Sequence, residues 1–197
     1  FPVNNMLDII VQVSNYDYRG GGIWDVIKLG TAEKIKQYYT GNLSRDFFVT
    51  GSFLMIGLYH LIVFFFFRRR FSPLYLGLVS IAIATRVVST GEIVLNTFVN
   101  MPFHIIIRFE FISMFLITTF LVLFVYQLFS DEFPKTILKF LITSSLLFTV
   151  TGLLAPPLVV SYCTRPFEII MIFAACYGLY ISIKALQHKK KEAIFFL

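Results

Sequence analysis

The chain has 197 residues, of which 57% are hydrophobic and only 14% are charged, and its mean hydropathy is +0.79. This composition excludes an ordinary soluble domain and indicates a membrane protein. A net charge of +6 would suit nucleic acid, but the basic residues cluster at positions 68–70 and 188–191 beside apolar runs, where the positive-inside rule places them. We therefore predict the lipid bilayer as a partner and no nucleic acid.

The N-terminal part combines strand and turn patterns. Residues 8–14 and 23–29 mix β-branched and polar residues in near alternation, and three glycines at positions 20–22 lie between them; this pattern predicts two strands with a tight connection. Because a lone hairpin is marginal in water, we expect these strands to end a larger extracytoplasmic β-domain. Thr31 is the predicted N-cap of a short helix over residues 32–39.

The first membrane span is predicted at residues 47–67, because about 20 apolar residues in a helix cross the hydrocarbon layer. The arginines at 68–70 place its end in the cytoplasm, so this span runs inward. Further spans are predicted at 74–88, 105–129, 137–154 and 167–183, with an outer loop from Pro156 to Arg165 between the last two.

Small residues are expected to let the first two spans approach closely: Gly51 and Gly57 on the first, and Gly77 among others on the second. Residues 192–197 would begin a sixth span. Because the chain starts at Phe1 and stops within an apolar run, we expect it to be an internal fragment of a longer protein.

Two stretches carry a family resemblance. GSFLMIGLYHLIVFFFFRRR at residues 51–70, followed by SPLYLGL, resembles the first-span signature of the bacterial seven-transmembrane receptors with diverse intracellular signalling modules (7TMR-DISM). Upstream, VSNYDYRGGGIWDVIKLGTAEKI at residues 13–35 is similar to the end of the extracellular jelly-roll domain of that family. The resemblance implies that residues 1–44 end a jelly-roll domain and that residues 45–197 form part of a seven-helix domain.

We therefore predict a mainly α membrane protein: a helical transmembrane bundle preceded by the last strands of a β jelly-roll domain. The resemblance implies a receptor in the bacterial inner membrane, with its N-terminal part extracytoplasmic. Its partners would be a small-molecule or carbohydrate ligand outside, a second copy in a homodimer, and a kinase, cyclase or phosphatase module in the cytoplasm. The alternatives are a small-molecule transporter or channel and, as a third class, a membrane-embedded enzyme.

Charged side chains within spans are costly, so each is a functional candidate. The predicted outer polar cluster consists of Arg86, His104, Arg108, Glu110 and Glu168, all near the outer ends of spans. Arg86 with Glu110, or Arg108 with Glu168, are candidate pairs. The cluster is either a ligand pocket or switch contact, or a set of interfacial side chains and salt bridges that pack helices.

Two more candidates lie outside this cluster. His60 in the first span either bonds across to Tyr75 or another helix or packs structurally. Trp24 belongs, with Tyr16 and Tyr18, either to a sugar-stacking platform beside the glycines or to an aromatic core. The sequence contains no recognisable catalytic set, metal-ligand spacing or cofactor motif, and we predict no cofactor, no metal and no disulfide.

Overall fold

The computed structural model describes residues 10–14, 18–20, 27–67, 70–90 and 101–187. Its described part contains the helices α1 (Ala32–Phe66), α2 (Ser72–Thr90), α4 (Phe103–Leu128), α5 (Lys135–Leu154) and α6 (Pro157–Gln187). All five helices are long and apolar enough to cross a membrane. The prediction of a mainly α membrane protein with five such helices is therefore confirmed.

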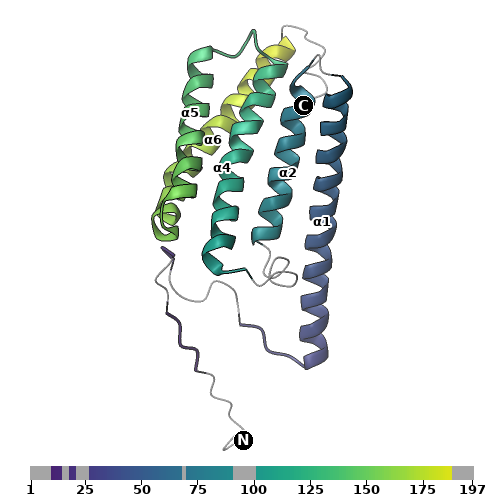
Figure 1. Ribbon diagram of the computed structural model, residues 1–197, viewed down its shortest axis with the longest axis vertical. Coiled ribbons are helices and arrows are strands. Elements are labelled where there is room, and N and C mark those ends of the chain that lie inside the picture. The colour runs from purple at the N-terminus through teal and green to yellow at the C-terminus, as the bar shows by residue number, and fades with distance from the viewer. Residues whose placement is uncertain (1–9, 15–17, 21–26, 68–69, 91–100, 188–197) are drawn as a thin grey trace, which may run out of the picture.

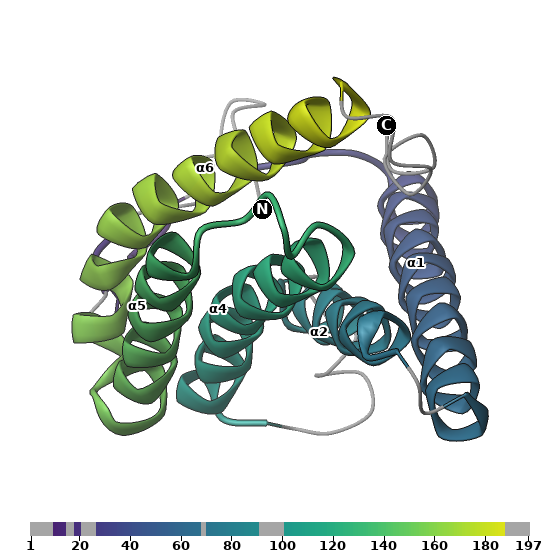
Figure 2. The same ribbon diagram turned by 90° about the horizontal axis from the view of Figure 1, so that it is seen from above.

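The helices stand side by side with alternating directions (Figure 1). Seen from above, α1 packs against α2, α2 against α4, and α6 crosses over α4 and α5 (Figure 2). We call the end of the bundle where α1, α4 and α6 begin the Tyr18 end, and the opposite end, where α2 and α5 begin, the Arg70 end. At the Tyr18 end, α1 extends beyond the neighbouring helices (Figure 1).

The contact between α1 and α2 depends on two glycines that face each other. A Cβ atom added to Gly57 would lie 2.8 Å from the Ile81 side chain and 3.2 Å from the carbonyl oxygen of Gly77. A Cβ atom on Gly77 would lie 3.1 Å from the Gly57 carbonyl oxygen. The backbones therefore approach as closely as small residues allow. Gly51 was predicted to share this role, but nothing lies within 4 Å of its Cβ position.

The other three helices enclose two separate apolar clusters, one toward each end. The Tyr18-end cluster consists of Ile107, Phe111, Phe115, Val160 and Phe167. The Arg70-end cluster consists of Val122, Val125, Phe129, Phe133, Leu141, Ile181 and Ala185. Between the parts of α6 that belong to these clusters, none of residues 168–180 is buried. Helix α6 is therefore most deeply buried near its two ends, while Ile170, Ala174 and Tyr177 of its middle pack partly buried against the Arg70-end cluster.

Helix α1 differs from the prediction of a short helix followed by a separate span. Thr31 caps the helix as predicted, with its Oγ1 accepting from the backbone N–H of Lys34 at 3.4 Å. The helix then continues without a break through residues 40–46 to Phe66. That stretch contains no proline, and the single Gly41 costs only about 1 kcal/mol relative to alanine, so helical hydrogen bonding continues through it.

The predicted outer loop between Pro156 and Arg165 is wrong. Helix α6 begins at Pro157, so only Ala155 and Pro156 separate it from α5. Proline suits the first position of a helix, because its missing N–H would have no partner there and its φ is already helical. Cys163, predicted in that loop, lies in α6 with Cys176, and both are free.

The predicted strands find no support in the described residues. Residues 10–14 and 27–29, which belong to those segments, are not in strands, and Ile10 is 93% exposed. A strand is stable only with partners, and none pairs with these residues in the described part. The rest of both segments, with Trp24, lies outside the described residues, so the jelly-roll domain stays a prediction.

Candidate functional site

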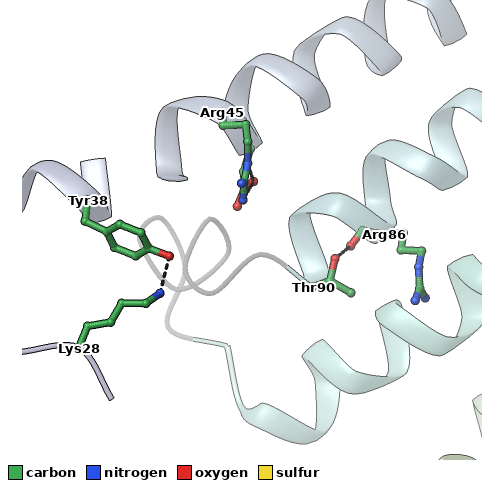
Figure 3. Close-up of polar contacts among 6 residues, drawn as sticks. Lys28, Tyr38, Arg45, Arg86 and Thr90 are labelled. Atoms are coloured by element: carbon green, nitrogen blue, oxygen red, sulfur yellow. Dashed lines mark hydrogen bonds and ion pairs between the residues drawn. The ribbon is translucent and has the colours of Figure 1, made fainter. Parts of the chain in front are cut away.

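Arg86 joins α2 to α4 at the Tyr18 end. Its Nη1 donates to the backbone carbonyl oxygen of Glu110 at 3.1 Å, and the hydroxyl of Ser113 donates to the same oxygen at 2.8 Å. One turn further along α2, the hydroxyl of Thr90 donates to the carbonyl of Arg86 (Figure 3). The structure thus brings the predicted partners Arg86 and Glu110 together, through the guanidinium and the main chain.

Arg108 binds the C-terminal end of α5. Its Nη1 donates to the carbonyl oxygen of Gly152 at 3.2 Å and also to that of Leu153. The last carbonyls of a helix have no partner within the helix and carry a partial negative charge, so a guanidinium is a favourable cap. In the described contacts, the carboxylate of Glu168 instead pairs with Arg165, 3.7 Å away on the same helix. The predicted pair of Arg108 with Glu168 is replaced by these two contacts.

The two histidines do not join this set. His104 is exposed at the second position of α4. His60 lies far along α1, and its Nδ1 donates to the carbonyl oxygen of Ile56 at 3.0 Å, one turn earlier in the same helix. That bond occupies one of the two ring nitrogens within α1, and the choice between a structural role and a bond to another helix stays a prediction. Within the described ranges, no three His, Cys, Asp or Glu residues are grouped to hold a metal.

Residues 18–20 dock on the Tyr18 end of the bundle. The ring of Tyr18 stacks on that of Phe111 in α4, with centroids 6.1 Å apart and planes 8° apart. The backbone N–H of Arg19 donates to the hydroxyl oxygen of Ser161 in α6 at 3.0 Å. Ser161 is fully buried and itself donates to the carbonyl of Leu158 at 2.6 Å. A segment far away in sequence therefore touches two helices at once.

The docked phenol faces the charged side chains of the outer polar cluster. Burial, which is the largest effect, and the negative charges of Glu110 and Glu168 raise the pKa of Tyr18 above its ordinary 10.0, whereas Arg19 and Arg86 oppose that rise. The phenol is therefore neutral at physiological pH. The docked ring therefore interacts electrostatically with Arg86, Glu110 and Glu168, which the sequence singles out.

The ring of Tyr18 also extends the Tyr18-end cluster. Within that cluster Phe115 lies 4.6 Å from Phe167 and 5.7 Å from Phe148, measured between ring centroids. Tyr18 packs against the cluster through Phe111. A displacement of residues 18–20 would therefore reach the side chains that hold α4, α5 and α6 together.

Sequence reasoning missed Ser161, and it named Tyr18 without predicting its contact with α4. Tyr18 was noticed as an aromatic beside glycines, but nothing in its spacing links it to α4. Ser161 lies in the stretch predicted as an outer loop, so its burial was not expected. Only the tertiary arrangement reveals this contact, because it joins residues 142 positions apart in the chain.

The apolar helices and their close crossings define a multi-pass membrane protein. Residues 44–197 match the family described as 7TM diverse intracellular signalling, a match that includes α1 from residue 44 and all of α2, α4, α5 and α6. The chain belongs to this family, as its resemblance in sequence indicated. Comparisons with curated proteins and with solved structures found no match.

Proposed function

We propose that the chain is the membrane part of a bacterial signalling receptor, in which residues 18–20 pass an extracytoplasmic signal to the helical bundle. The docking of Tyr18 on α4 and of Arg19 on α6 is the observation that carries this proposal. Membership of the family supports a transmembrane signalling role and gives no support to the transporter alternative. The output would be a cytoplasmic kinase, cyclase or phosphatase.

The segment before α1 would act on the bundle by two routes. The first is the docked contact itself. The second is α1, whose 35 residues form a rod about 52 Å long at 1.5 Å per residue. The ammonium of Lys28 donates to the hydroxyl of Tyr38 and lies 3.9 Å from its ring centroid, which ties the preceding segment to α1 (Figure 3). Movement outside would therefore tilt α1 about its crossing with α2.

A ligand outside would switch the receptor only by binding one of two bundle packings more tightly than the other. The outer polar cluster would then be a switch contact, because Arg86 and Arg108 bind main-chain carbonyls and so hold helices in place. The ligand, a small molecule or carbohydrate, would bind the extracytoplasmic part, and a homodimer would pair the effectors.

The orientation follows from charge. In the sequence, basic residues at 68–70 and 188–191 follow α1 and α6, both of which end at the Arg70 end, so that end would lie in the cytoplasm and the Tyr18 end outside. Single cysteines at Lys36 and at Gln187, in a chain with Cys163 and Cys176 replaced by serine, test this. A membrane-impermeant maleimide should label position 36 in intact cells and position 187 only after the membrane is opened. The reverse pattern would refute the orientation.

The function is tested by reading the gene beyond Leu197 and assaying the encoded effector in membranes that contain the full-length protein. We expect two more spans followed by a kinase, cyclase or phosphatase module. Tyr18→Ala should change the output of that module several-fold, whereas Tyr18→Phe keeps the ring and should resemble the wild type. A second set of spans without an effector, or equal output from all three proteins, would contradict the proposal.

A further inference from the structure

At the Arg70 end, an ion pair joins the end of α6 to the turn between α4 and α5. The ammonium of Lys184 lies 3.1 Å from a carboxylate oxygen of Glu132. The Glu132 side chain is only 11% exposed and that of Lys184 is 40% exposed, so water screens this pair less than it screens the exposed pair of Arg165 and Glu168. The pair of Arg165 and Glu168 lies within one turn of α6, whereas the pair of Lys184 and Glu132 connects two separate elements.

The turn that carries Glu132 is well fixed on its own side. The backbone N–H groups of Glu132 and Phe133 both donate to the carbonyl of Phe129 at 3.1 Å. Phe133 is 4% exposed, and its ring meets Tyr126 of α4 edge to face at 5.9 Å. The same ring meets Tyr177 of α6 edge to face at 5.3 Å. The turn therefore presents one apolar and one ionic contact to α6.

Helix α6 has the features of an element that can swing. Pro166 lies inside it and lacks the N–H that would bond to the carbonyl of Tyr162, so the helix is weakened there. Pro166 lies just before Phe167, the residue that anchors α6 in the Tyr18-end cluster. Beyond it no residue is fully enclosed until Ile181, and a Cβ atom at Gly178 would meet nothing within 4 Å. The contacts of this stretch with the Arg70-end cluster are made by the partly buried side chains of Ile170, Ala174 and Tyr177.

We infer that Glu132, Phe133 and Lys184 form a latch that holds the end of α6 against the α4–α5 turn, and that α6 swings about Pro166 when the latch opens. The hinge and the latch are 18 residues apart, about 27 Å along the helix at 1.5 Å per residue. A small bend at Pro166 would therefore move Lys184 by several ångströms. This inference does not depend on the proposed receptor function, because it concerns a movement that can be measured without any signal.

The test is a distance measurement on the full-length protein in lipid nanodiscs, with Cys163 and Cys176 replaced by serine. Spin labels are placed at Thr136, exposed in the first turn of α5, and at Gln187, the last residue of α6. Pulsed electron spin resonance then measures the distribution of distances between the two labels. The wild type should give one dominant short distance, which corresponds to the latched position.

Opening the latch should add a second, longer distance. Lys184→Met and Glu132→Gln each remove one charge of the ion pair. The ratio of latched to released molecules should then fall about tenfold, which lies between the small effect of breaking an exposed ion pair and the large effect of breaking a buried one. The double exchange Glu132→Lys with Lys184→Glu should restore the short distance. Arg165→Gln, which removes the exposed pair on the same helix, is the matched control and should leave the distribution unchanged.

Two further measurements keep the inference testable if a latch variant folds poorly. Raising the salt to about 1 M shortens the screening length to about 3 Å and should release part of the unmodified protein. Pro166→Ala should reduce the released population in the Lys184→Met background, because the hinge becomes an ordinary helical residue. If neither the charge variants nor salt changes the distribution, or if Arg165→Gln changes it as much as Lys184→Met, the latch is refuted.

Discussion

Gly57 is the residue at which the packing of α1 on α2 is most sensitive to size. Gly57→Ala would place a methyl group 2.8 Å from the Ile81 side chain and 3.2 Å from the Gly77 carbonyl oxygen, so the Ile81 side chain or the helices must shift, and the free energy of unfolding should fall by about 1–3 kcal/mol. Gly51→Ala is the matched control on the same helix. Nothing lies near its Cβ position, and alanine favours helix by about 0.5–1 kcal/mol. Titration with a denaturing detergent measures the free energy of unfolding of both variants. Equal losses of stability would contradict the close contact between α1 and α2 at Gly57.

Arg108 is expected to stabilise the fold more than any exposed ion pair does. Arg108→Gln removes the charged donor from the carbonyl oxygens of Gly152 and Leu153, and the free energy of unfolding should fall by about 1–3 kcal/mol. Arg165→Gln removes an exposed pair and should cost less than about 1 kcal/mol. The same detergent titration compares the two variants, and a larger loss for Arg165→Gln would refute the role of Arg108.

Tyr18 should make the docking of residues 18–20 sensitive to alkaline pH. Below pH 10 the phenol is neutral whether the segment is docked or free, so docking has its full strength. Because burial and nearby carboxylates raise the pKa of the docked phenol, the free phenol ionises first above pH 10, and docking weakens as the pH rises further.

Spin labels at Val13 and Tyr162 follow this release as a change in their distance. Tyr18→Phe, which cannot ionise, should keep the short distance at a pH where the wild type has lost it. Release of both proteins over the same pH range would show that another group is responsible.

Among the elements, α1 is a single continuous helix from its outer part into its membrane part, and this continuity can be tested with proline. Asn42→Pro should break the helix between its outer part and its membrane part, because an interior proline costs about 3 kcal/mol. Ala32→Pro occupies the first helical position, where proline is tolerated, and should leave the helix intact. A spin label at Lys36 should gain mobility only in Asn42→Pro. Equal mobility in both variants would mean that the outer part of α1 is not a continuous helix with the rest.

The sequence predicted the apolar helices well because length and hydropathy determine what can cross a membrane. It predicted less well where a helix continues beyond its apolar stretch. Residues 32–46 of α1 and residues 157–166 of α6 are more polar than the spans. The short helix was predicted to end at residue 39 although no proline follows before the span, and the two successive prolines that were interpreted as a stop are compatible with the start of a helix.

The candidate site was predictable only in part, for a similar reason. The unusual cost of charge in a span identified Arg86, Arg108 and Glu110, and all three lie at the Tyr18 end. Their partners could not be predicted from the sequence. Arg86 and Arg108 bind main-chain carbonyl oxygens of other helices, and because every residue has such an oxygen, no sequence pattern marks the partner. The docking of Tyr18 depends on tertiary contact alone.

At the scale of the whole molecule, α6 connects the two ends of the bundle. Its first turns accept the N–H of Arg19 through Ser161, and its last turn carries Lys184 of the latch. Ser161 and Lys184 lie on opposite sides of Pro166, so a shift of the first turns would change the bend at Pro166 and thereby move the end of α6 that carries Lys184. Release of residues 18–20 should therefore change the position of α6 at the Arg70 end.

The most direct test is the distance between labels at Thr136 and Gln187 in the Tyr18→Ala protein, compared with the wild type and with Tyr18→Phe. We expect Tyr18→Ala to increase the long-distance population at the Arg70 end, and Tyr18→Phe to keep the short distance because its ring still stacks on Phe111. If Tyr18→Ala gives the wild-type distribution in a protein where Lys184→Met clearly releases α6, the two ends of the bundle are not coupled through α6.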